Sequence, residues 1–157
     1  MIDSNTGSTT PPKINRFQKF ALSLQVFLLR RGWMGPAGDF LMAITTTGRK
    51  TGSTFTIPIS YLRDGDDIIA LNPGNSNWYR NVLANGQAVI EVKGQRMPVS
   101  GSLVEEEAER QRIYNLHRQG DPKIFERIFK IHPDASEEQL QAALKKWQFV
   151  RFKRSNQ

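Results

Sequence analysis

The chain has 157 residues and no cysteine, which excludes disulfide bonds, thiol nucleophiles and metal sites with cysteine ligands. Twenty-two lysines and arginines against fifteen acidic residues give a formal net charge of +7, which favours anionic partners. No apolar run approaches the roughly 18–20 residues that span a bilayer, and the polar start lacks the features of a signal peptide. We therefore expect a single domain and a cytoplasmic location.

Residues 1–12 are small and polar and end in two prolines, so we expect a disordered lead-in to a domain over residues 13–157. From Lys13 to Arg31 apolar residues recur with the period of an α-helix, which Gly32 should end. We interpret the stripe as a face that lies on the core. The alternative is a basic amphipathic helix that contacts anionic lipid or roofs an apolar pocket, which would associate the protein with a membrane surface. The stripe consists of Phe17, Phe20, Ala21, Leu24, Phe27, Leu28 and Arg31.

Six apolar or β-branched runs separated by turn residues predict strands. Pro58 has no N–H group to give to a neighbouring strand, so the second strand should be at an edge, or bulged, near that point. The predicted strands cover residues 40–46, 54–62, 68–71, 88–92, 96–104 and 147–153.

Helices separate the later strands. A short helix is expected over residues 78–84, capped by Ser76 or Asn77 and closed by Gly86. Further helices should cover residues 105–117, 122–130 and 136–146, and the last opens with the capping-box pattern of Ser136 and Gln139. This order, with mostly short antiparallel connections, predicts an α+β, mainly β fold: a small, partly closed barrel of antiparallel strands with peripheral helices.

The turn Gly48-Arg49-Lys50-Thr51-Gly52 joins the first two strands and is a candidate anion site. Its glycines permit positive φ angles and a close approach to the backbone, successive N–H groups can point at an anion, and two cations supply charge. The alternative is an ordinary hairpin with solvated basic residues. The turn is not a P-loop, because no helix follows it.

The usual catalytic constellations are absent. His117 and His132 lie in the helical third, away from the glycine-rich turn, and are expected to be packing or surface residues that form no metal site. If the chain is an enzyme, a cofactor should carry the reactivity. Nucleic-acid binding is not predicted, because aromatic and basic residues do not alternate along a strand, except in the last one.

Several motifs together resemble the deazaflavin-dependent nitroreductases, within the split β-barrel flavin and deazaflavin oxidoreductases. They keep their order and spacing over about residues 40–105. The loop over residues 72–77 is shorter than is usual in that family. The motifs are Thr45-Thr46-Thr47-Gly48-Arg49-Lys50-Thr51-Gly52, Pro58-Ile59-Ser60-Tyr61, Asp64-Gly65, Pro73-Gly74, Trp78-Tyr79-Arg80-Asn81-Val82 and Ala84-Asn85.

The resemblance implies a split β-barrel that binds coenzyme F420, whose phosphodiester and oligoglutamate tail are anionic. It implies hydride transfer from the reduced coenzyme to a quinone, an enone or a nitro compound, and no catalytic residue is assigned. A homodimer is expected, because barrels of this group commonly pair. Alternatives are FMN as the cofactor, or a non-catalytic protein that binds a lipid or fatty acid. The implied cofactor residues are Arg49, Lys50 and Thr51 for the phosphate and tail, with Thr47, Gly48 and Gly52 of the same turn, the backbone around Ala70, Leu71 and Asn72 and the loop to Asn77 for the ring, and Trp78 and Asn81 on the helix beneath the site.

Overall fold

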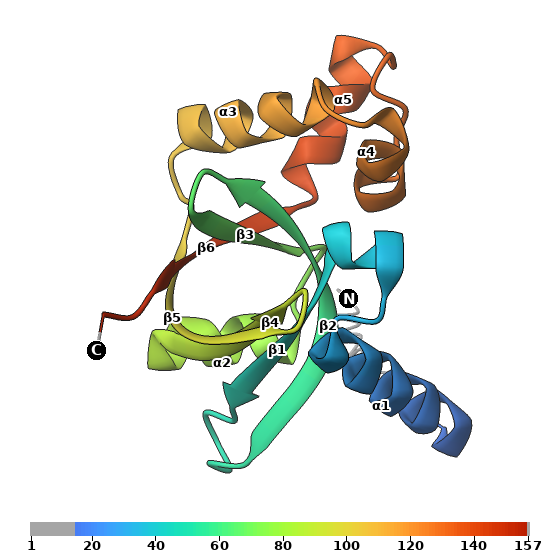
Figure 1. Cartoon of the computed structure of the whole chain (residues 1–157). Helices are drawn as coiled ribbons and strands as arrows, with labels where there is room; N and C mark the ends of the chain where they lie inside the picture. Colours follow the sequence, from blue (N-terminus) through green and yellow to red (C-terminus); the bar gives the residue numbers. More distant parts are fainter. Residues whose placement is uncertain (1–14, 157) are drawn as a thin grey trace, which may run out of the picture.

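Six antiparallel strands form a closed barrel in the order β1-β2-β3-β6-β5-β4, with helices around it (Figure 1). The computed structural model describes residues 15–156, so the expected lead-in over residues 1–12 lies outside the described residues. The predicted fold class is confirmed, and the barrel is closed where a partly closed one was expected. The strands are β1 Leu41–Thr47, β2 Thr54–Asp64, β3 Asp67–Asn72, β4 Gln87–Val92, β5 Gln95–Leu103 and β6 Gln148–Arg154. The helices are α1 Arg16–Arg31, the 3-10 helix η1 Gly35–Asp39, α2 Asn77–Asn85, α3 Glu107–Arg118, α4 Pro122–Phe129 and α5 Glu137–Lys145.

The last strand, β6, lies between two apolar cores, because its successive side chains point to opposite sides of the sheet. Val150 and Phe152 point into the barrel, where Trp78 and Val82 of α2 join them. Phe149 points the other way, into a second core formed with α3, α4 and α5. Successive side chains of a strand face opposite sides of the sheet, so one strand serves both cores.

The proline in β2 sits where the strand has one neighbour. Pro58 pairs with Ala43 of β1, whereas the pairing of β2 with β3 begins only at Tyr61. The missing N–H group of Pro58 therefore interrupts no β2–β3 hydrogen bond. The prediction of a local edge at this point is confirmed.

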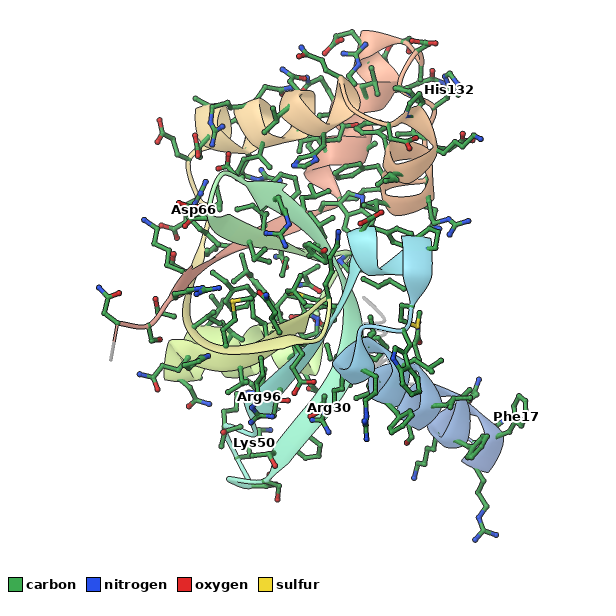
Figure 2. The ribbon with its side chains drawn as sticks, in the orientation of Figure 1. Phe17, Arg30, Lys50, Asp66, Arg96 and His132 are labelled. Atoms are coloured by element: carbon green, nitrogen blue, oxygen red, sulfur yellow. The ribbon has the colours of Figure 1, made fainter. Side chains whose placement is uncertain are left out.

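The expectation that the apolar stripe of α1 lies on the core is wrong. Val26 and Leu29 are the buried residues of α1, whereas Phe17 is 77% exposed and Phe20 66% exposed. In Figure 2, Phe17 lies at the far end of α1 and points away from the barrel. The first half of the helix extends past the sheet, so none of residues 15–156 covers its stripe (Figure 1). Periodicity identifies residues that share a helix face, but not what that face meets.

The second half of α1 is fastened to the barrel by a buried acid. Glu91 of β4 has a side chain only 5% exposed, and it pairs with Arg30 of α1 at 2.8 Å and with Arg96 of β5 at 3.0 Å. Both arginines are labelled near the lower rim of the barrel in Figure 2. A carboxylate in such a place needs compensating cations, and these two provide them.

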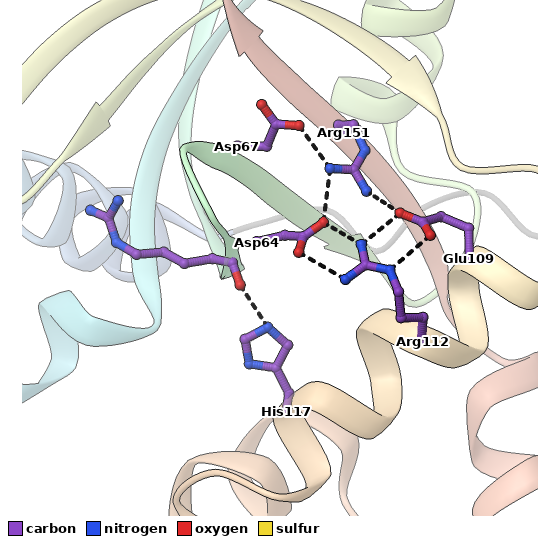
Figure 3. Close-up of polar contacts among 7 residues, drawn as sticks. Asp64, Asp67, Glu109, Arg112, His117 and Arg151 are labelled. Carbon is purple, nitrogen blue, oxygen red and sulfur yellow. Dashed lines mark hydrogen bonds and ion pairs between the residues drawn. The ribbon is translucent and has the colours of Figure 1, made fainter.

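Ion pairs connect α3 to the barrel (Figure 3). Arg151 of β6 lies 2.9 Å from Asp64, 2.7 Å from Asp67 and 2.7 Å from Glu109. Arg112 of α3 also bonds both Asp64 and Glu109. We call these five residues the α3 clamp.

His117 of α3 packs against the barrel, as expected for a residue outside the site. Its Nε2 lies 2.9 Å from the Arg63 carbonyl oxygen (Figure 3). Burial lowers the pKa of His117, so the ring is neutral and Nε2–H donates this hydrogen bond.

We predict that His117→Gln makes the free energy of unfolding less dependent on pH below neutrality. An unfolded histidine titrates at about pH 6.5, so below that value the unfolded chain binds a proton that the folded chain does not, and the free energy of unfolding falls. Glutamine keeps an amide donor but does not titrate. Urea denaturation should therefore show that the free energy of unfolding falls more between about pH 7.5 and about pH 5 in the wild type than in the variant. Equal losses would contradict the assigned neutral state.

Candidate functional site

The β1–β2 turn needs both of its glycines, for different reasons. Gly52 has a φ of 70°, in the left-handed region, and its N–H donates to the Gly48 carbonyl at 2.9 Å. A side chain at Gly48 would lie 2.7 Å from Thr51 Oγ1 and 3.1 Å from the Phe55 ring. The turn is thus compact, and Arg49, Lys50 and Thr51 are presented on its exposed tip.

Helix α2 holds this turn through two asparagines on one helix face. Asn81 Oδ1 accepts hydrogen bonds from the Arg49 backbone N–H at 3.2 Å and from Arg49 Nη1 at 2.9 Å. Asn81 Nδ2 donates to Thr46 Oγ1 at 3.2 Å, and Asn85 Nδ2 donates to the Thr47 carbonyl at 2.8 Å. Residues four apart share a helix face, so both amides reach β1 and its turn.

The turn keeps free donors and uncompensated charge. Among residues 15–156, the backbone N–H groups of Lys50 and Thr51 have no protein partner, and neither Arg49 nor Lys50 pairs with a carboxylate. Two cations and two free N–H groups form a donor set that suits a phosphate or carboxylate group.

The implied ring residues lie in the interior. Ala70 faces the barrel core, Leu71 faces the helical core, and Asn72 is fully buried. Asn72 Nδ2 donates to Gln148 Oε1 at 2.6 Å, while its Oδ1 accepts from Ser76 Oγ at 2.8 Å. The structure therefore brings the turn and Asn81 together, and it buries the side chains of Ala70, Leu71 and Asn72.

The two remaining implied residues lie at the start of α2. Asn77 is exposed, whereas Trp78 is buried in the barrel core. Ser76 is the N-cap residue as predicted, but its hydroxyl bonds Asn72 and makes no capping bond to an α2 N–H group. The first turn of α2 thus lacks a side-chain cap, which leaves its positive end available to an anion.

Sequence reasoning missed three residues here: Asn75, Arg80 and Asn85. Arg80 Nε donates to Asn75 Oδ1 at 2.9 Å, across the start of α2. The spacing of Asn81 and Asn85 could have indicated a shared face. The five-residue separation of Asn75 and Arg80 spans a loop and a helix, so no periodicity reveals it.

The barrel is of the split-barrel type found in several solved structures. It is similar to HutZ, the heme storage protein from Vibrio cholerae, with 12% identity, a TM-score of 0.54 and coverage of 87% of this chain and 92% of that chain. A Listeria innocua structure named after pyridoxamine 5′-phosphate oxidase is similar at 11% identity and a TM-score of 0.51, covering 84% of this chain and 92% of that chain. Identities this low establish the fold alone.

Sequence similarity identifies the family to which the chain belongs. The model of the family "F420H(2)-dependent quinone reductase" matches residues 30–131, and this chain belongs to that family. An F420H(2)-dependent quinone reductase of Mycobacterium tuberculosis is 31% identical over 81 residues, which cover 48% of this chain and 54% of the relative. The chain thus spans about half the length of the curated relatives it matches. The turn and α2 lie inside the matched range, and most of α1 lies outside it.

Proposed function

We propose that this chain is an F420-dependent reductase that delivers a hydride to a quinone or another electron-poor small molecule. The observation that carries the proposal is the β1–β2 turn, where Arg49 and Lys50 have no carboxylate partner within residues 15–156 and Arg49 is held to α2 by hydrogen bonds to Asn81. This turn lies within the range that matches the family.

The chain's own residues would bind and orient. The exposed donors of Arg49, Lys50 and Thr51 suit the anionic phosphodiester and tail of F420, and the Asn81 bonds hold the turn rigid before binding. The chemistry supplied by reduced F420, when bound, is hydride donation. The protein's part is then mainly the positioning of the coenzyme and the acceptor.

The test is a fluorescence titration of the purified chain with F420, followed by oxidation of the reduced coenzyme in the presence of a soluble quinone. Binding at micromolar or lower concentration and quinone-dependent oxidation are expected. A parallel titration with FMN examines the alternative cofactor. Failure to bind either compound would overturn the proposal. A lipid released from the purified protein on denaturation would favour the non-catalytic alternative.

We also propose that α1 contacts an anionic membrane surface. Its exposed stripe of Phe17, Phe20, Leu24 and Phe27 continues into Trp33, which is 66% exposed. The helix carries Arg16 and Lys19 near this stripe and has no acidic residue, a composition that suits the interface of an anionic bilayer. No helix within residues 15–156 is long and apolar enough to cross a membrane, so the contact would be peripheral. A quinone dissolved in a membrane would then be close to the site.

We predict that Phe17→Ser/Phe20→Ser/Phe27→Ser lowers binding to phosphatidylglycerol vesicles by at least about tenfold, because burial of one such side chain contributes about 1.5–3 kcal/mol. Vesicle sedimentation measures the effect. Added salt should weaken wild-type binding, because part of the attraction is electrostatic.

The matched control is Leu83→Ser/Leu116→Ser, which removes exposed apolar side chains outside α1. Equal binding of the triple variant and the wild type would contradict the contact. Light scattering without vesicles tests whether the stripe instead joins two copies, the homodimer that stays a prediction.

A further inference from the structure

A groove of about 500 Å³ opens between α4 and α5, beside the residue that follows β3. This volume lies within the range of roughly 300–1,000 Å³ that is usual for small-molecule sites. The two helices lie next to each other on the same side of the barrel (Figure 1). The groove shares no residue with the β1–β2 turn or with α2. Its apolar lining consists of Pro73, Phe129, Ile131, Ala142, Ala143 and Trp147.

Two of the lining residues are aromatic and packed together. The rings of Phe129 and Trp147 meet edge to face, with their centroids 5.8 Å apart. Phe129 is buried, whereas Trp147 is only partly buried. The backbone at Trp147 is fixed, because its carbonyl oxygen accepts a hydrogen bond from Arg110 at 2.7 Å. A flat aromatic ligand suits such a lining, because it can stack on one ring or meet it edge to face.

Two lysines supply positive charge to the same groove. Lys130 follows the last residue of α4, Lys146 follows the last residue of α5, and both line the groove. Within residues 15–156 neither ammonium group pairs with a carboxylate. An anionic group on the ligand would therefore meet two charges that no acid of this part of the chain neutralises.

The backbone of Lys130 is unusual for a lysine. Its φ is 59°, in the left-handed region, where a helix most often places a glycine after its last turn. A lysine is less stable than glycine in this conformation, because its Cβ crowds the backbone. A contact between the lysine side chain and a ligand gives a reason for a lysine at this position.

Most of the groove lies outside the range that the family model matches. That range ends at residue 131, whereas α5 and Trp147 follow it. The groove is therefore a feature of this chain's own C-terminal part, and membership of the family does not account for it.

We infer that this groove binds a small aromatic carboxylate. The aromatic body would lie against Phe129 and Trp147, and the carboxylate would pair with Lys130 and Lys146. Such binding requires neither the β1–β2 turn nor coenzyme F420, so this site is independent of the proposed function.

The probes are 2-naphthoate and its uncharged analogue 2-naphthamide, each titrated by calorimetry into the full chain. We expect 2-naphthoate to bind with a Kd below about 1 mM. The amide should bind about tenfold more weakly, because it forms no ion pair with either lysine. Ala142→Phe places a ring in the groove from an exposed position of α5, so it should abolish binding while the chain still folds.

Lys130→Gly separates the effect of the charge from the effect on the fold. Glycine suits the left-handed conformation, so this variant should melt at or above the wild-type temperature. Its Kd for 2-naphthoate should nevertheless rise roughly three- to fivefold, and Lys146→Met should raise the Kd by a similar factor. The matched control is Lys145→Met, which removes an exposed lysine of the same helix that does not line the groove. Its Kd should stay within about twofold of the wild type.

Several results would overturn the site. Absence of saturable 2-naphthoate binding, or wild-type affinity in Ala142→Phe, would exclude the groove. Equal binding of the acid and the amide would exclude the role of the lysines. An unchanged Kd in Lys146→Met with a lower melting temperature would mean that this lysine only complements the end of α5. Tighter binding of decanoate than of 2-naphthoate would contradict the aromatic class of ligand.

Discussion

Replacing Arg49 and Lys50 together with alanine is expected to weaken F420 binding by at least about 100-fold. Hydrogen bonds to charged groups contribute about 1.5–3 kcal/mol each, and a loss of about 2.8 kcal/mol already corresponds to 100-fold in Kd. Both side chains are exposed and unpaired with any carboxylate among the described residues, so the binding energy lost is not offset by release of a partner. Fluorescence titration measures Kd directly.

The double variant must be distinguished from a general loss of positive charge. Arg16→Ala/Lys19→Ala removes the same charge from exposed positions of α1 and should leave F420 affinity within about twofold, because salt screens charges beyond about 10 Å. The Arg49 change also removes one bond to Asn81, so the melting temperature should fall slightly. If the two double variants weaken binding equally, long-range attraction and not the turn would explain the affinity.

Much of the fold could be predicted because local signals agreed with the final packing. Ser136 and Gln139 form the predicted capping box, and Gly32 and Gly86 end their helices in the left-handed conformation. Pro58 marked the segment of β2 that pairs only with β1. Closure of the barrel could not be predicted, because the alternation over residues 147–153 defines the faces of β6 but not its neighbours, β3 and β5.

The candidate site could likewise be predicted only in part from the sequence. The turn over residues 48–52 is one contiguous segment, so glycine and charge spacing were sufficient to find it. The pair Asn75–Arg80 and the bond from Asn85 to Thr47 arise only once α2 packs beside β1. The burial of Ala70 and Asn72 likewise depends on β6, which is remote in sequence.

The α3 clamp provides the second large effect: Arg151→Met should lower the free energy of unfolding by about 3 kcal/mol at neutral pH. Removing one partner of a largely buried ion pair leaves the other charges uncompensated, and Arg151, 17% exposed, contacts Asp64, Asp67 and Glu109. The value is at the lower end of the usual range, because Arg112 still compensates Asp64 and Glu109.

The pH dependence of this effect identifies its cause. Hydrogen bonds from Arg112, and secondarily from Arg151, lower the pKa of Asp64 below its ordinary value. The stabilisation is therefore complete above the unfolded pKa of about 3.9 and is lost as the pH falls through the lower folded value. The difference in free energy of unfolding between the wild type and Arg151→Met should therefore become smaller as the pH falls from about 7 to about 3. Urea denaturation measures this difference. Arg154→Met, on the same strand but without an ion pair among the described residues, should change little at either pH. If that difference in free energy of unfolding persists at acid pH, Arg151 acts through the packing of its aliphatic stem against β6 and α3 and not through its charge.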